Sequence, residues 1–499
     1  MFIRGVNSFS LFLIWLKTIV AKMRFLFGVI ALLAVLFSSC QKDEISHSSG
    51  DRLMFSRDTV LFDTVFTSVG SATTRFKVYN NGSHRIRIAD IALAGASSSP
   101  YRINIDGEPG PRVTNVEIAA GDSIYVFVDV NVDPQGSDSP LSIEDSIVFS
   151  LNGNCQSVKL LSWGQDVVLL NKAEIHTQTF TANKPYLIYG YAYVPKGEIL
   201  SVEPGARFYF HNSARFYVEG SLSANGTQEN PISFEGDRLE EFYKTKAGQW
   251  GGIYFMPGSS GNMLNWTVVK NAITGVQVDT FKVANTPTLT ILNSRVENMS
   301  AVGLLARGAI VRAANSLFAN CGQATVALVY GGDYEFIHCT LANYWGNYYS
   351  RKYPQLWLNN YYITTIAGAT TMVARDLERA DFKNCIVYGS MSNEVWVDTS
   401  YSGVASPAQM KFTFENSVVR IPNSTPLAAH HFLNVTRDDP EFIDVQKFSY
   451  LLDTLSPAKD LGRIDYGALF PVDLKGDSRV LDNLPDAGAY ERVEKKIRR

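Results

Sequence analysis

Short stretches of alternating hydrophobic and polar residues follow one another along most of the chain, separated by Gly, Asn or Pro. In residues 53–166 they include 76–79, 86–88, 124–130, 147–149 and 158–160. Asn80-Asn81-Gly82 predicts a tight hairpin turn between the first two of these strands. Short strands at this spacing, with turn signals between them, predict a β-sandwich.

The second half of the chain contains a repeated phrase. Residues 293–298 read Asn-Ser-Arg-Val-Glu-Asn, 315–320 read Asn-Ser-Leu-Phe-Ala-Asn, and 338–343 read His-Cys-Thr-Leu-Ala-Asn. The first residues of these copies are 22 and 23 positions apart, and weaker copies begin at Asn265, Asn384 and Asn416. A period in the low twenties predicts a solenoid with one coil per repeat. Because 338 and 384 are 46 positions apart, we expect residues 344–383 to form one additional full coil.

The first residue of each copy predicts a ladder of stacked side chains at one turn of the coil. Asn tolerates a left-handed backbone, and its amide can bond to the amide one coil above. His338 occupies the same position, which favours a structural role over a catalytic or metal-binding one. Cys339 and Cys385 occupy the position that Ser fills in other copies, so we expect small stacked residues two coils apart, too far for a disulfide.

Several phrases give the repeat region a family resemblance. They are 202–210, 216–220, Gly226-Thr227, Asn230-Pro231-Ile232, Trp250-Gly251-Gly252-Ile253 and the closing 485–491. Residues 190–491 resemble right-handed parallel β-helix proteins of the pectate-lyase-like type. That family includes polysaccharide lyases, hydrolases and adhesins, so the resemblance implies a fold and leaves the chemistry open. We therefore predict an all-β chain: an immunoglobulin-like β-sandwich at 53–166, a right-handed parallel β-helix at 167–440, its C-terminal cap at 441–491, and a basic tail at 492–499.

The beginning of the chain resembles a bacterial lipoprotein signal. Met23-Arg24 precedes a 13-residue apolar run at 25–37, which is too short to span a membrane and ends just before Ser38-Ser39-Cys40. We predict a signal peptide at 1–40 with Met23 as the true start, and lipidation at Cys40. Gln41-Lys42-Asp43-Glu44 resembles a surface-export tag, and the polar residues 41–52 suit a flexible tether. These features predict an outer-membrane lipoprotein that faces the exterior.

Composition limits the partners. The net charge is −3 and charged residues make up 19% of the chain, which gives no support for nucleic-acid binding. Aromatic residues reach 12%, a value compatible with an all-β protein and with a carbohydrate surface. The five cysteines form no C-x-x-C motif, and His430-His431 lacks a third ligand, so we predict no metal and no cofactor.

One aromatic and basic stretch, 343–362, interrupts the repeat. We expect Leu356 and Leu358 to point inward with Trp357 outward between them. The preceding loop would then present aromatic faces that stack on sugars and basic groups that bind uronate or sulfate. The candidate glycan contacts are Tyr344, Trp345, Tyr348, Tyr349, Arg351 and Trp357. An equally supported alternative is that these aromatic residues pack as a satellite cluster against the solenoid or the first domain.

Enzymatic alternatives have less support. A lyase would place Arg351 and Lys352 beside Asp333 and Glu335, and it could use calcium as a cofactor. A hydrolase needs carboxylates on adjacent coils, and we find no acids at matching positions of successive copies. The leading hypothesis is a non-enzymatic glycan-binding or adhesive surface protein. A polysaccharide lyase or hydrolase acting on an acidic glycan, and a purely structural surface component, remain as alternatives.

Overall fold

A computed structural model describes residues 22–23, 44–67, 69–134, 136–281, 285–345, 351–366, 368–428, 430–481 and 483–493. The chain is all-β and divides into two compact units, with 69–132 in the first and 163 onward in the second. The predicted fold class, a β-sandwich followed by a parallel β-helix, is confirmed. Within the described ranges, no helix is long and apolar enough to cross a membrane.

The first unit is built from two five-stranded sheets. One contains, in spatial order, β1 (Met54–Phe55), β3 (Thr74–Tyr79), β8 (Ser123–Val130), β5 (Tyr101–Ile105) and β6 (Glu108–Pro109). The other contains β2 (Thr59–Phe66), β10 (Asn154–Gln165), β9 (Leu141–Leu151), β4 (Ile86–Leu93) and β7 (Arg112–Ile118). Alternate residues are buried along these strands, as in Val78, Ile88, Val126 and Phe149.

The predicted hairpin at Asn80-Asn81-Gly82 is wrong, because β3 and β4 lie in different sheets. The Asn80 side chain is buried and donates to the carbonyl oxygens of His84, Ile118 and Ala119 at 2.8, 3.1 and 2.9 Å. This amide fixes a corner that carries the chain from one sheet to the other. The described end of the predicted tether is also held, since Ile45 forms a bridge with Arg85.

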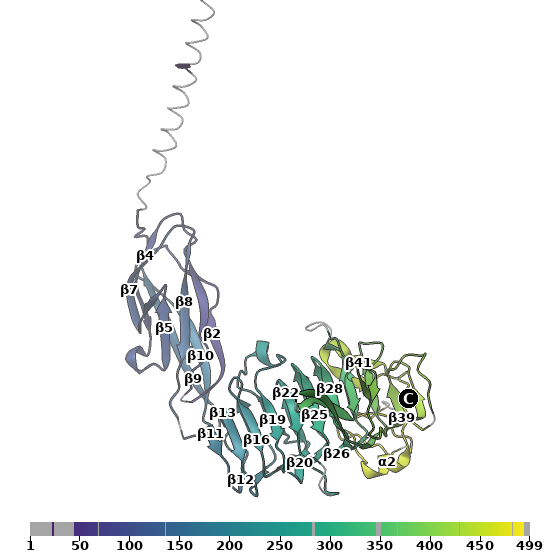
Figure 1. Cartoon of the computed structure of the whole chain (residues 1–499). Helices are drawn as coiled ribbons and strands as arrows, with labels where there is room; N and C mark the ends of the chain where they lie inside the picture. Colours follow the sequence, from purple (N-terminus) through teal and green to yellow (C-terminus); the bar gives the residue numbers. More distant parts are fainter. Residues whose placement is uncertain are drawn as a thin grey trace, which may run out of the picture. The chain divides into compact units, whose positions relative to one another are not determined.

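The second unit is a stack of coils, entered through β11 (Val168–Glu174), β12 (Gln178–Phe180) and β13 (Tyr186–Val194) (Figure 1). From β13 to β28 (Ala324–Val329) each strand pairs in parallel with the strand three places later, so each coil contains three strands and the stack has three faces. We name these faces the tryptophan sheet, the ion-pair sheet and the covered sheet.

The tryptophan sheet contains β16 (Arg215–Val218), β19 (Gly252–Phe255), β22 (Thr274–Val278), β25 (Val302–Arg307), β28 (Ala324–Val329), β31 (Leu356–Asn359) and β36 (Val395–Asp398). The ion-pair sheet contains β14 (Ile199–Val202), β17 (Ser221–Asn225), β20 (Asn262–Asn265), β23 (Leu289–Leu292), β26 (Ile310–Ala314), β29 (Gly332–Ile337), β34 (Leu377–Lys383) and β39 (Thr413–Val419). The covered sheet contains β15 (Arg207–Phe210), β18 (Ile232–Gly236), β21 (Thr267–Lys270), β24 (Arg295–Met299), β27 (Leu317–Cys321), β30 (Thr340–Asn343) and β35 (Ile386–Gly389), and the second half of β39 continues it. β40 (Phe432–Thr436) pairs with β39. From β29 on, inserted hairpins make the pairing interval five strands instead of three for β29, β30, β31 and β34.

The predicted ladder is confirmed in part: the Asn416 amide donates to the carbonyl oxygen of Leu461 at 2.8 Å instead of to the neighbouring coil, and the left-handed residue of the first copy is Trp266, one position after Asn265. Asn293 donates to the Oδ1 of Asn265 at 2.9 Å, and Asn315 donates to the Oδ1 of Asn293 at 2.8 Å. His338 is fully buried, has a positive φ of 50°, and places its Nε2 3.0 Å from the Nδ2 of Asn384. The structural role predicted for His338 therefore agrees with its surroundings.

The extra coil expected at 344–383 is absent. Thr340 pairs directly with Ile386, so the 46-residue interval is one coil with two insertions: the loop after β30, and a hairpin of β32 (Tyr361–Ile366) and β33 (Ala369–Ala374). Cys339 and Cys385 consequently lie in adjacent coils, with the Cys339 N–H 3.4 Å from the Cys385 sulfur, and both are free thiols. Counting residues could not distinguish an added coil from insertions within one.

The closing segment, 441–493, lies along the flank of the stack. It contains β41 (Phe442–Asp444), β42 (Ser449–Leu452) and α2 (Ile464–Leu469). Tyr450 packs on Leu317 and Ala342, and its hydroxyl donates to Asn320 at 2.6 Å. Because this segment occupies the outer face of the covered sheet, the outward residues of β27, β30 and β35 are buried, and all but Thr340, whose hydroxyl accepts from the Ala489 N–H at 2.8 Å, are apolar or aromatic.

Candidate functional site

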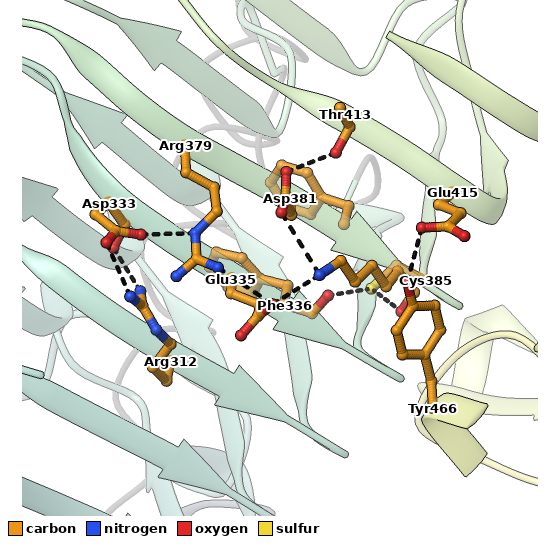
Figure 2. A network of polar contacts seen from close by, with 12 residues as sticks. Arg312, Asp333, Glu335, Phe336, Arg379, Asp381, Cys385, Thr413, Glu415 and Tyr466 are labelled. Atoms are coloured by element: carbon orange, nitrogen blue, oxygen red, sulfur yellow. Dashed lines mark hydrogen bonds and ion pairs between the residues drawn. The ribbon is translucent and has the colours of Figure 1, made fainter. Parts of the chain in front are cut away.

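The outer face of the ion-pair sheet carries a network of charged side chains (Figure 2). Asp333 accepts from Arg312 at 2.9 Å and from Arg379 at 2.8 Å. Glu335 accepts from Lys383 at 2.7 Å, and Lys383 also lies 3.6 Å from Asp381. Cations and carboxylates thus alternate from β26 to β34.

This network corrects one inference from the sequence. Glu335 and Asp381 are Cα partners on the adjacent strands β29 and β34, so acids do occupy matching positions of successive coils. Both precede the ladder residue of their copy, His338 or Asn384, by three positions. Counting back from the ladder would have found the pair.

The same contacts argue against acid–base catalysis here. Burial acts to raise the pKa of Asp333 and of Glu335, but the bonds from neighbouring Arg and Lys side chains outweigh it and lower both. A glycosidase requires one carboxyl that stays protonated near neutral pH, which needs a raised pKa. Asp333 and Glu335 are both held ionised, and each is bonded to a cation.

The four residues of the lyase hypothesis are not brought together. Asp333 and Glu335 belong to the ion-pair sheet, whereas the guanidinium of Arg351 bonds to Glu394, just before β36, and to the carbonyl oxygen of Asn343 in β30. The Arg351 and Glu394 side chains are 2% and 0% exposed. Lys352 is exposed. Within the described ranges no group of three or more His, Cys, Asp or Glu residues could hold a metal ion.

The predicted aromatic contacts are divided between interior and surface. Trp345 is 3% exposed, and Tyr344 packs against Phe442 and Tyr450 of the closing segment. Burial raises the pKa of Tyr344. Tyr348 and Tyr349 lie outside the described residues, as does Cys40. Of the predicted set, Trp357 is the described aromatic residue on an outer face of the stack.

Trp357 forms a surface cluster with Tyr353 and Trp396. As predicted, Leu356 and Leu358 are buried and Trp357 points outward between them. Trp396 is its Cα partner on the next coil, and the two indole rings meet edge to face at 5.7 Å. The Tyr353 ring is nearly parallel to that of Trp396, at 6.1 Å and 9°. Tyr353 and Trp396 are 45% and 40% exposed.

Polar groups lie beside these rings. The carboxylate of Asp398, two positions after Trp396, accepts from the Asn359 amide at 3.2 Å and from the Tyr361 hydroxyl at 2.9 Å. The Trp357 indole donates to the carbonyl oxygen of Pro354 at 2.7 Å, which fixes that ring. We call Tyr353, Trp357, Asn359, Trp396 and Asp398 the tryptophan site.

The sequence contained a signal for the missed member Trp396. Val395-Trp396-Val397-Asp398 repeats the pattern of Leu356-Trp357-Leu358-Asn359, with a Trp between two aliphatic residues and a polar residue next. Arranged in parallel coils, two such strands place their Trp residues side by side. Exposed aromatic faces next to amide and carboxylate groups can pack against an apolar face and exchange hydrogen bonds with hydroxyls.

Comparison with known proteins adds little to this geometry. No protein-family model matches the chain, and no curated protein does. Among solved structures, the catalytic unit of the GH87 α-1,3-glucanase from Streptomyces thermodiastaticus matches 73% of this chain and 89% of its own, at 10% identity and a TM-score of 0.19. A family 123 glycoside hydrolase from Clostridium perfringens matches 24% of this chain and 26% of its own, at 8% identity and a TM-score of 0.17. The PapD-like domain 7 of human CEP192 matches 26% of this chain and 92% of its own, at 10% identity and a TM-score of 0.17. The chain thus spans about a quarter of the glycoside hydrolase of family 123, and likenesses this weak carry no argument about function.

Proposed function

We propose that this protein is a surface-exposed outer-membrane lipoprotein that binds a glycan, without cleaving it, at the tryptophan site. The supporting observation is the exposed cluster of Tyr353, Trp357 and Trp396, with the Asn359–Asp398 pair beside it. Flat apolar rings next to fixed hydrogen-bonding groups match the surface of a sugar, which combines C–H faces with hydroxyls.

The other two faces of the stack support the choice of this one. The covered sheet lies beneath the closing segment from β27 onward. On the ion-pair sheet the carboxylates of Asp333 and Glu335 are already paired with cations. The alternative of a lyase or hydrolase acting on an acidic glycan loses its support, because Arg351 is enclosed with Glu394. A purely structural component would not need the exposed rings of Tyr353 and Trp396 at the end of the tryptophan sheet.

Binding should be tested with the purified chain on immobilised neutral and acidic polysaccharides, with and without calcium. Trp396→Ala should weaken binding about tenfold or more, since an exposed aromatic anchor typically contributes over 1 kcal/mol. Phe242→Ala is the matched control, because Phe242 is 67% exposed and lies outside the tryptophan site. Equal binding by wild type and Trp396→Ala would reject the site, and shortening of any polysaccharide would reject the non-enzymatic assignment.

The proposed lipid anchor and the location at the cell surface need a separate experiment. Lipidation at Cys40 predicts that a labelled fatty acid is incorporated into the wild-type protein and not into Cys40→Ser. Surface exposure predicts that protease added to intact cells removes the wild-type protein. Labelling of both forms, or complete protection from protease, would contradict this part of the proposal.

A further inference from the structure

The tryptophan site is one end of a row of outward residues that crosses the whole tryptophan sheet. The Cα pairing runs without a shift through the seven strands of the sheet and through β13, which pairs with β16: Tyr193, Tyr217, Tyr254, Gln277, Leu305, Ala327, Trp357 and Trp396. Neighbouring strands are about 4.8 Å apart, so seven steps extend over about 34 Å. The far end of this row is again aromatic.

The three tyrosines form a second aromatic cluster, which we call the tyrosine station. The Tyr217 and Tyr254 rings meet edge to face at 5.9 Å, and all three side chains are partly exposed. Two hydroxyls are held by carboxylates: Tyr193 donates to Glu219, and Tyr254 donates to Asp279 at 2.8 Å. These bonds orient the rings along the sheet.

In this row the residues between the two aromatic ends are smaller or aliphatic. They are Gln277, Leu305 and Ala327, and Leu305 and Trp357 pack around the buried Ala327. From Trp357 to Tyr254 there are four coil steps, or about 19 Å. A ligand that contacts both ends must therefore be long and extended along the stack axis.

The charges along this row do not favour a polyanion. The charged side chains in the strands of this sheet are Arg215, Arg307 and Asp398, and Glu219 and Asp279 directly follow β16 and β22. Arg307 is bonded to Asp279 at 3.1 Å. Lys352, which precedes Tyr353, adds one cation and only balances the acids. An acidic polysaccharide needs an array of available cations, and an uncharged one needs none.

We infer that the ligand is an uncharged, extended polysaccharide lying along the tryptophan sheet and contacting both the tryptophan site and the tyrosine station. This inference rests on the proposed function and names the class of glycan. Two linked contacts on one chain raise the local concentration of the second, so long chains bind much more tightly than short ones.

The test uses the purified chain, a neutral polysaccharide that binds it (galactomannan, xyloglucan or α-1,3-glucan as first probes), and fragments of that polymer shorter and longer than the gap. Tyr217→Ala should weaken binding of long fragments about tenfold and leave disaccharide binding unchanged. Trp396→Ala should weaken both. Tyr125→Ala is the control, because Tyr125 is 37% exposed in the first unit. Polygalacturonate should bind at least tenfold more weakly than the neutral polymer.

Hydrogen exchange on the wild-type chain keeps the test independent of any folding defect in Tyr217→Ala. Long fragments should protect β16 and β19 as well as β31 and β36, and short fragments should protect β31 and β36 alone. Protection confined to β31 and β36 with long fragments, or polygalacturonate binding as tight as that of the neutral polymer, would overturn this inference and leave the proposed function intact. A chain that binds no glycan, or that binds equally well without Trp396, would overturn the proposed function itself.

Discussion

Glu394→Ala should destabilise the β-helix strongly, because Glu394 is the partner of a buried cation. Its carboxylate accepts from the Arg351 guanidinium at 3.0 and 2.5 Å, and from the backbone N–H groups of Met391 and Gln355 at 3.0 and 3.1 Å. Burial raises the pKa of Glu394, although the bonds from Arg351 act in the opposite direction. Removing this carboxylate leaves the buried guanidinium without its counter-charge, bonded only to neutral oxygens such as the Asn343 carbonyl, and takes away the acceptor of two backbone N–H groups.

The expected loss is about 3–5 kcal/mol, the range for breaking a buried ion pair by deleting one partner. A surface pair gives the comparison: Arg238 and Glu240 are 41% and 38% exposed, and Glu240→Ala should cost about 1 kcal/mol or less. Replacing both buried partners, as Arg351→Met with Glu394→Leu, should recover most of the loss because no unpaired charge remains.

Urea unfolding of the purified chain, followed through the transition of the β-helix, measures these differences. With a slope of about 3 kcal/mol per molar urea or more, Glu394→Ala should lower the midpoint by about 1 M. If the free energies of unfolding of Glu394→Ala and Glu240→Ala differ by less than about 1 kcal/mol, the reasoning is refuted. The double variant should also bind glycan as the wild type does, and lost binding in a folded double variant would return Arg351 to the contact set.

Three further predictions concern other polar networks. Asn315→Ala should lower the free energy of unfolding by about 2–4 kcal/mol, measured by urea, because a residue at a φ of 50° loses its bonds to Asn293 and Arg479. Burial raises the pKa of Glu491 from its ordinary 4.5 to about 8, so its contribution to stability is complete below about pH 4.5 and is lost as the pH rises through 8. Glu491→Gln should flatten the dependence of Tm on pH in this window, and an unchanged slope would contradict the assignment. The pKa of Glu335 is lowered, so its contribution is present above about pH 4.5 and disappears in acid; Glu335→Gln should cost about 1 kcal/mol at pH 7, less in high salt, and nothing in glycan affinity.

The regular part of the fold could be predicted because it follows from a local rule. A left-handed turn recurs at Asn293, Asn315, His338, Asn384 and Asn416, and the amides of Asn265, Asn293 and Asn315 bond to one another as expected. The prediction that Leu356 and Leu358 point inward and Trp357 points outward is confirmed for the same reason, because successive side chains of any β-strand point to opposite faces. The prediction of a hairpin turn at Asn80 was wrong because the geometry there is set by backbone carbonyl groups far along the chain.

The site could be predicted only in part because a side chain's type does not reveal its partner. Arg351 was expected on the surface, and Glu394, 43 positions later, encloses it. Trp345 was expected beside Trp357 as a contact, yet it is buried and Trp357 is not. Trp357 and Trp396 become neighbours only when the β32–β33 hairpin is recognised as an insertion inside a single coil, and that fact is absent from the spacing of the repeat.

The three faces of the coil share one strand geometry and differ in what covers them, which separates stability from function in this chain. The covered sheet gains its apolar outward residues because the closing segment excludes water there. The ion-pair sheet satisfies its charges internally, so a substitution such as Glu335→Gln perturbs stability alone. The tryptophan sheet leaves aromatic area exposed at both ends of one uninterrupted row, from Tyr193 to Trp396. Covering exposed aromatic area removes it from water and is favourable, so a ligand would gain hydrophobic contact energy along this row.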